Sequence, residues 1–340
     1  MALGTISELL TFNEWAREKL MVSADALSDT QLDRRFEMGE GSLRATLAHL
    51  WFAEQIWLDR WLGDNRPPLA RADGVISIAE LHDRFRKTAA ERKAFLTPKS
   101  ARDLDSPITF TNMRNETYTY SLRDLLLHVC NHGSHHRAQA LNMMRHVGAE
   151  LPKPGVDYIF MKIEQQAAGA GAPADALDAR NLRSYYAYAD WARERVHDAA
   201  ASLTDGALDR PFEMGVGTLR KTLVHMRDAE QWWLDSWNNR PADGFPAADA
   251  SLSVAEIRRR YTETAQTRNT MLKTMSDAEL TRIVKAVPRP GVVREFPIGV
   301  TMLQLCHHGT HHRAQALNML RHVGGTIPGL DYSRMLSEKH

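Results

Sequence analysis

The sequence contains little cysteine, no long apolar run and almost no net charge. The two cysteines, Cys130 and Cys306, are too few for a disulfide scaffold and suit a reducing compartment, so we expect both to be small buried side chains. No stretch approaches the roughly 18 apolar residues that a membrane span needs. The first twenty residues also lack the basic start and apolar run of an export signal. We therefore expect a cytoplasmic protein that has no membrane partner.

The charges are numerous but balanced. Lys and Arg total 43 and Asp and Glu total 42, which gives a formal net charge of +1, and the two signs alternate along the chain. The sequence has no stripe of basic residues that could bind the phosphates of a nucleic acid, so nucleic acid is not an expected partner. With 340 residues, 43% of them hydrophobic, the chain is long enough for two globular domains with packed cores.

The chain contains the same segment twice. Residues 36–61 match residues 212–237 at 17 of 26 positions, and residues 132–148 match residues 308–324 at 15 of 17. Both matches are separated by the same offset of 176 residues. The sequence therefore predicts a tandem duplication of one domain.

The duplication also suggests the domain boundaries. We expect one domain at residues 1–163 and the other at residues 178–340. Residues 164–177, which are rich in Ala and Gly and contain no aromatic side chain, are expected to form the linker.

The apolar residues of each repeat follow a helical period. In the first repeat the pattern predicts helices through residues 6–20, 42–61, 77–96 and 121–148. Residues 108–120 alternate in polarity instead and predict a hairpin. The expected fold is therefore all-α, with two tandem four-helix bundles that each carry a small β-hairpin before the last long helix.

Histidine is abundant, with 15 copies in the chain. His132 and His136 are four positions apart on the last helix of the first repeat, which places their side chains within about 40° on one face and roughly 6 Å apart at Cβ. That spacing suits two ligands of one metal ion. His49 is the only mid-helix histidine outside the last helix that both repeats keep, and it would complete a set of three. The equivalent residues of the second repeat are His225, His308 and His312.

Three neutral imidazoles suit Zn, Ni or Fe and leave a position for water or substrate. We therefore predict one divalent transition metal in each domain. The alternatives are a hydrogen-bonded core residue for His49 and a solvated polar face for His132 and His136. The repetition of all three residues favours the metal. His135 and His311 could form a different ligand pair or line the pocket, and the sequence leaves their role open.

Two acidic residues interrupt an apolar stripe. Glu54 and Glu230 occupy the same place in the two repeats, so each is expected to be buried and paired. The suggested partners are Arg137 and Arg313, although a role in supporting the metal stays open. His146 falls in the last turn of its helix, where a cation complements the helix dipole, and is expected to have a structural role.

The motifs of several enzyme classes are missing. Gly133 and Gly309 stand where an HExxH metalloprotease helix has its general-base glutamate, which argues against peptide hydrolysis. No GxGxxG, Walker or GxSxG motif occurs either. No catalytic residue can therefore be assigned from the sequence.

The helix-two histidine together with HGSHHRAQ on helix four resembles the DinB-like (YfiT-like) superfamily of metal-binding four-helix bundles. The resemblance covers nearly the whole of each repeat. It implies that the metal is held by the helix-two histidine and by both histidines of an HxxxHR element. In this chain those residues are His49, His132 and His136 in the first repeat, and His225, His308 and His312 in the second.

The resemblance also implies a chemistry. Characterised relatives are metal-dependent transferases or isomerases that use low-molecular-weight thiols such as mycothiol, bacillithiol or glutathione. We therefore expect a small-molecule substrate and a thiol whose attack is activated by the metal. The alternatives are a non-catalytic module that binds or senses a small molecule through its metal, and a purely architectural pairing of bundles. Because relatives are often homodimers, the chain is expected to be a homodimer or a monomer with an internal pseudo-dimer.

Overall fold

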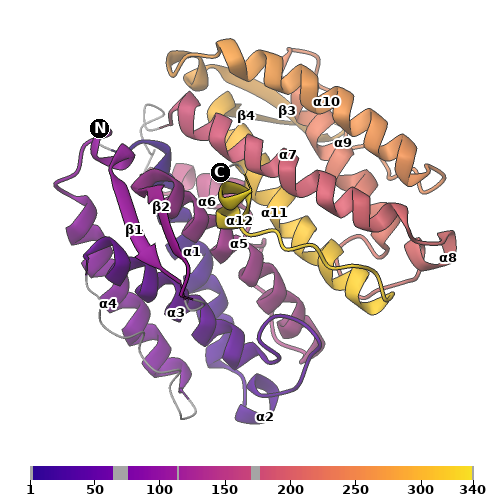
Figure 1. The fold of residues 1–340 in the computed structure, drawn as a ribbon. Helices are drawn as coiled ribbons and strands as arrows, with labels where there is room; N and C mark the ends of the chain where they lie inside the picture. The colour runs from indigo at the N-terminus through magenta and orange to yellow at the C-terminus, as the bar shows by residue number, and fades with distance from the viewer. Residues whose placement is uncertain (1–2, 64–75, 113–114, 170–176, 339–340) are drawn as a thin grey trace. The chain divides into compact units, whose positions relative to one another are not determined.

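The computed structural model describes residues 3–63, 76–112, 115–169 and 177–338, and it consists of helices with two small hairpins (Figure 1). The predicted all-α class is confirmed. Packing divides the chain into two units. The first comprises Met1–Val156 and Asp331–Ser333, and the second comprises Asp157–Leu330 and Arg334–His340. The predicted domain boundaries stay predictions.

The first unit contains the four predicted long helices and the predicted hairpin. Ser42 and Ser77 each accept a hydrogen bond from the backbone N–H three residues later, which caps a helix start. Gly148 follows the last helix with a φ of 76°, the left-handed conformation that suits glycine. The elements are α1 (Thr5–Asp25), α2 (Asp29–Leu32), α3 (Leu43–Trp61), α4 (Ile78–Leu96), a 3₁₀ turn (Asp103–Asp105), β1 (Pro107–Thr111), β2 (Thr117–Ser121) and α5 (Leu122–His146).

The second unit repeats this order and adds a helix in front of it. Its elements are α6 (Tyr158–Ala167), α7 (Ala179–Ala201), α8 (Asp205–Leu208), α9 (Leu219–Trp237), α10 (Val254–Thr274), a 3₁₀ turn (Ala278–Thr281), β3 (Ile283–Arg289), β4 (Val292–Pro297) and α11 (Ile298–His322). The chain ends in α12 (Tyr332–Ser337). Helix α6 packs on α11.

The long helices pack as neighbours around an apolar core in each unit. In the first unit α5 lies against α1 and α3, and α4 lies against α3. Leu47, Phe85 and Met143 come from three different helices and are at most 2% exposed. Burying such a side chain contributes about 1.5–3 kcal/mol, so the predicted apolar stripes hold the bundle together.

The first residues of the predicted linker are helical. Residues 164–167 form the last turn of α6, because Glu, Gln and Ala are good helix formers. Residues 170–176 of that linker lie outside the described residues, as do residues 113–114 of the first predicted hairpin. In the part of the chain that the structure describes, no helix is both long enough and apolar enough to cross a bilayer.

Candidate metal centre

Helices α3 and α5 bring the three predicted histidines of the first unit together. Helix α3 packs against α5, and His49 of α3 faces two histidines of α5. One ring nitrogen from each of His49, His132 and His136 lies within 4.8 Å of the others. The Nε2 atoms of His49 and His132 are 3.2 Å apart.

Helices α9 and α11 form the same arrangement in the second unit. The ligand nitrogens of His225, His308 and His312 again lie within 4.8 Å of one another, and the Nε2 atoms of His225 and His308 are 3.2 Å apart. The ring centroids of His308 and His312 are 4.4 Å apart, the same distance as in the first unit. Each unit can therefore hold one metal ion.

The nitrogen spacing fits a transition metal. Two nitrogens bound to one tetrahedral ion at about 2.05 Å lie about 3.3 Å apart. The observed 3.2 Å in both units matches that value. A hydrogen bond between two imidazoles would also give this distance, but it does not account for the third imidazole that joins each pair.

The protonation of the clusters favours metal binding. Burial, together with the neighbouring histidines, holds the pKa of His132 and of His136 well below its usual value. In the second unit burial lowers the pKa of His308 to about 3 and that of His225 to about 4. These imidazoles are therefore neutral at pH 7, and each offers a lone pair.

A glutamine fixes the orientation of one ligand in each unit. Nδ1–H of His136 donates to Oε1 of Gln139 at 2.7 Å, which leaves Nε2 free to face the cluster. Nε2 of Gln139 donates in turn to Nε2 of His135 at 3.1 Å. Gln315 makes the same two bonds in the second unit. His135 is therefore one step removed from the cluster.

A glycine lets the preceding loop approach this glutamine. Gly39 has a φ of 52°, and a Cβ there would lie 2.8 Å from Oγ1 of Thr46 and 3.1 Å from Oε1 of Gln139. Gly215 has a φ of 53°, and its Cβ would lie 2.5 Å from Oε1 of Gln315. A side chain at either position would displace the group that orients a ligand.

Gly133 stands at the position of the HExxH glutamate, and a side chain there would clash with its neighbours. A Cβ on Gly133 would lie 2.6 Å from Oδ1 of Asn13 and 2.8 Å from a guanidinium nitrogen of Arg137. Arg137 is buried, donates to Oγ of Ser134 at 2.9 Å and also donates to Asn13. The site that would carry a general base in a metalloprotease is therefore occupied by a buried arginine network.

The buried glutamate of the first unit is paired, as predicted, but with other partners. Oε1 of Glu54 lies 3.1 Å from Arg17 of α1, and its Oε2 lies 2.6 Å from Arg92 of α4. The suggested partner Arg137 also acts on Glu54 through its charge, and it donates hydrogen bonds to Asn13 and Ser134 beside it. Glu54 therefore links three helices.

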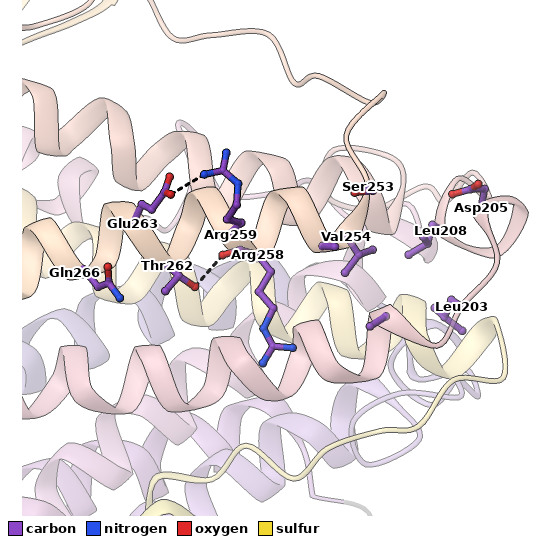
Figure 2. Close-up of a pocket in the computed structure, with 12 residues that line it drawn as sticks. Leu203, Asp205, Leu208, Ser253, Val254, Arg258, Arg259, Thr262, Glu263 and Gln266 are labelled. Atoms are coloured by element: carbon purple, nitrogen blue, oxygen red, sulfur yellow. Dashed lines mark hydrogen bonds and ion pairs between the residues drawn. The ribbon is translucent and has the colours of Figure 1, made fainter.

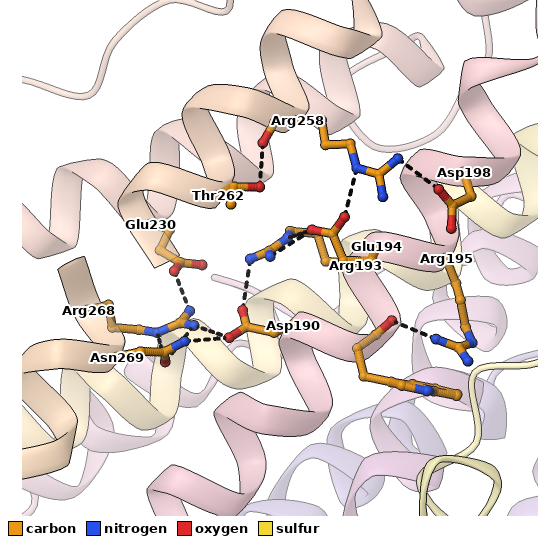
Figure 3. Close-up of polar contacts among 11 residues, drawn as sticks. Asp190, Arg193, Glu194, Arg195, Asp198, Glu230, Arg258, Thr262, Arg268 and Asn269 are labelled. Carbon is orange, nitrogen blue, oxygen red and sulfur yellow. Dashed lines mark hydrogen bonds and ion pairs between the residues drawn. The ribbon is translucent and has the colours of Figure 1, made fainter. Parts of the chain in front are cut away.

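The equivalent glutamate of the second unit has fewer cations around it. Glu230 pairs with Arg268, which also binds Asp190 at 2.6 Å (Figure 3). Arg193 occupies the position of Arg17 but turns to Asp190, 2.8 Å away (Figure 3). Burial raises the pKa of Glu230, whereas Arg268, Arg193 and Tyr261 each act to lower it.

The surroundings of the two clusters differ. In the first unit Oε1 of Glu40 lies 3.7 Å from Nδ1 of His49, and the ring of His128 is 5.8 Å from that of His132. In the second unit the ring of Phe245 is 5.3 Å from His225. Sequence reasoning missed these neighbours. Only the glutamine of HRAQ carried a signal, since that motif recurs intact.

The cysteines and the terminal histidine lie outside the clusters. Cys130 and Cys306 are buried, as predicted, and burial raises the pKa of each thiol to about 12. Both thiols are therefore protonated at neutral pH. The ring of His146 packs 6.1 Å from that of Phe36.

A groove of about 770 Å³ on the second unit is separate from the cluster (Figure 2). The C-terminal turn of α7, helix α8 and helix α10 line it, with Leu203, Leu208 and Val254 among its apolar side chains. Arg259, on its rim, is paired with Glu263 at 2.6 Å. None of the clustered histidines lines this groove.

Each unit is thus a helical bundle in which one histidine of the second long helix meets two histidines of the last long helix. The chain belongs to the DinB family, whose sequence profile matches residues 1–168 and 177–339. It is similar to Protein DinB of Bacillus subtilis (strain 168), with 24% identity over 168 residues that span 47% of this chain and 96% of the relative. A crystal structure of a DinB-like protein from Bacillus cereus ATCC 10987 is 22% identical and covers 45% of this chain and 97% of its own, with a TM-score of 0.36.

Proposed function

We propose that each unit binds one divalent transition metal through its three histidines. These ligands are His49, His132 and His136 in the first unit, and His225, His308 and His312 in the second. The observation that carries the proposal is the convergence of three partly or fully buried imidazoles at the same spacing in both units. Zn and Ni suit this donor set best, and Fe comes next.

We further propose that the protein is an enzyme, a transferase or isomerase that uses a low-molecular-weight thiol. A divalent ion held by three neutral ligands keeps its positive charge and favours the deprotonated form of a coordinating thiol at neutral pH. The chain contributes the orientation of the ligands, through Gln139 and Gln315. The aromatic ring of Phe245 borders the second cluster, 5.3 Å from the ring of His225.

Thiol binding to the Ni or Co form tests the proposal. The untagged protein is stripped with a chelator, refilled and titrated separately with glutathione, mycothiol and bacillithiol. A sulfur-to-metal charge-transfer band is expected, with an onset well below the free thiol pKa of about 8.5. The band should vanish in the double variant His136→Ala with His312→Ala.

The outcomes separate the competing functions. Refilled protein that contains no metal would overturn the whole proposal. Metal-loaded protein that binds none of the three thiols would overturn thiol use and favour a module that binds another small molecule. A charge-transfer band without turnover of any electrophile would favour a sensing role.

A further inference from the structure

The segment before α6 is anchored on the helix that carries two ligands of the second cluster. The backbone N–H of Ile159 donates to Oε1 of Gln304 at 2.8 Å. Tyr158 is fully buried, and its ring lies 6.0 Å from that of His307. Residues from Asp157 onward belong to the second unit, although the family profile places them at the end of the first repeat.

This anchor fixes where Asp157 lies. Gln304 precedes His308 by four residues on α11, so the two side chains share one face of the helix. Asp157 is the N-cap residue of α6, yet its carboxylate makes no capping hydrogen bond. His311, Gln304 and His225 each act to lower the pKa of its carboxyl group, in keeping with a place beside the second cluster.

The position is costly for a carboxylate. Burial raises the pKa of Asp157, and this is only partly offset by His311, Gln304 and His225. A cation held in the three-histidine cluster would supply this carboxylate with a full counter-charge.

In the first unit, the segment that follows the second repeat takes the equivalent place. Asp331–Ser333 belong to the first unit, although they follow the second repeat in sequence. The hydroxyl of Tyr332 donates to Oδ1 of Asp124 on α5 at 3.2 Å. The charge of Asp331 acts on His128, which precedes His132 by one helical turn.

We propose that the two repeats exchange their trailing Asp-Tyr segments, so that Asp157 serves as the charge partner of the second metal centre and Asp331 as that of the first. This inference rests on the proposed metal binding. In this scheme Asp157 is a positioning residue and not a metal ligand, because the group of ligand atoms consists of three histidine nitrogens. Its negative charge stabilises the bound ion electrostatically. Each centre then depends on residues from both repeats.

Metal affinity measured one site at a time tests the exchange. The background His132→Ala leaves the second site, and His308→Ala leaves the first. Asp157→Asn removes the charge and keeps an equally good N-cap residue. In the His132→Ala background it should weaken Zn binding about 10- to 100-fold, the usual effect of losing a group that supports a metal ligand. Competition with a chromophoric chelator gives the affinity.

The same variant provides its own control. Asp157→Asn in the His308→Ala background should leave the affinity of the first site within about twofold. Asp331→Asn should show the opposite pattern with a smaller effect, because Asp331 is exposed and solvent screens its charge. Asp157→Ser, a second neutral N-cap, should reproduce the loss caused by asparagine.

Each remaining outcome overturns one claim. If neither background binds Zn, the proposed function fails and the exchange fails with it. If the second site binds Zn with the same affinity before and after the Asp157→Asn substitution, the exchange alone is wrong. Equal weakening of both sites by Asp157→Asn would indicate a general structural effect and would also refute the exchange.

Discussion

The two units hold their histidines alike but surround them differently. The ring centroids of His49 and His136 are 4.6 Å apart, and so are those of His225 and His312. Around them, Glu40 of the first unit corresponds to Val216 of the second. The glutamine that orients a ligand occurs in both units, whereas the carboxylate of Glu40 beside His49 has no equivalent at position 216. The cluster geometry is therefore set by helix packing and by that glutamine, and the surroundings can diverge without disturbing it.

The largest expected effect is the complete loss of one metal ion with retention of the other. His132→Ala and His308→Ala should each remove one of two metal ions and leave the other, because each cluster lies within its own unit. The measurement is metal stoichiometry after chelation and refilling, by elemental analysis. A value near one in the unmodified protein would show that one unit does not bind metal.

His146→Ala is the matched control on the same helix. Its ring packs against Phe36 outside the cluster, so metal content should stay unchanged. Loss of a metal in this variant, with retention in His132→Ala, would contradict the choice of ligands on α5.

The second prediction compares the buried glutamates. Burial alone would raise the pKa of Glu54, but Arg17 and Arg92 hold it below its usual value. Burial does raise the pKa of Glu230, which Arg268 offsets only in part. Glu54→Gln leaves the buried Arg17 without its carboxylate partner, whereas Arg92 keeps its ion pair with Glu14 at 2.7 Å. The change should cost about 3–5 kcal/mol of unfolding free energy.

Glu230→Gln should cost clearly less. Arg268 keeps its ion pair with Asp190 at 2.6 Å in that variant, and Arg193 is paired elsewhere (Figure 3). Urea unfolding followed by circular dichroism measures both variants under identical conditions. Equal costs would show that the number of paired arginines does not distinguish the two units.

These glutamates show where sequence reasoning stops. Burial and pairing could be predicted, because a charge at a fixed place in an apolar helix stripe must be compensated. The partner could not, since Arg17 and Arg92 lie on helices whose rotation depends on the packing of the whole bundle. The histidine pair four residues apart needed no such knowledge, because one helix alone sets its geometry.

The unit against which each trailing segment packs could not be predicted from the sequence either. The pattern around Asp157 and Asp331 marked the ends of the repeats but not the unit on which each end packs. Contacts such as Ile159 with Gln304 join residues far apart in the chain. No local periodicity encodes a contact of that kind.

The third prediction concerns a buried histidine that only the second unit has. His197 is fully buried, and neither ring nitrogen makes a hydrogen bond within the described residues. Its counterpart in the first unit is Met21, which is also buried. Burial lowers the pKa of His197 to about 4, whereas an unfolded chain has a value of about 6.5.

The sign of the pH effect follows from these values. Between pH 6.5 and 4 His197 is protonated in the unfolded state but neutral in the folded state. The free energy of unfolding therefore decreases as the pH falls. The loss from this group should reach about 2.5 kcal/mol at pH 4.5 relative to pH 7.5. His197→Met should remove that part of the pH dependence, measured by urea unfolding at both values. If His197→Met leaves the difference in unfolding free energy between the two pH values unchanged, His197 is not held neutral in the folded protein.

The smallest expected effect tests what the two units share. Gln139→Leu removes the acceptor for Nδ1–H of His136 and should weaken Zn binding at the first site about 10- to 100-fold in the His308→Ala background. Gln139→Glu keeps an acceptor at that place and should largely restore the affinity, since a carboxylate orients a metal-bound imidazole as well as an amide does. Equal losses in both variants would indicate that packing beside Gly39, rather than the hydrogen bond to His136, fixes the ligand.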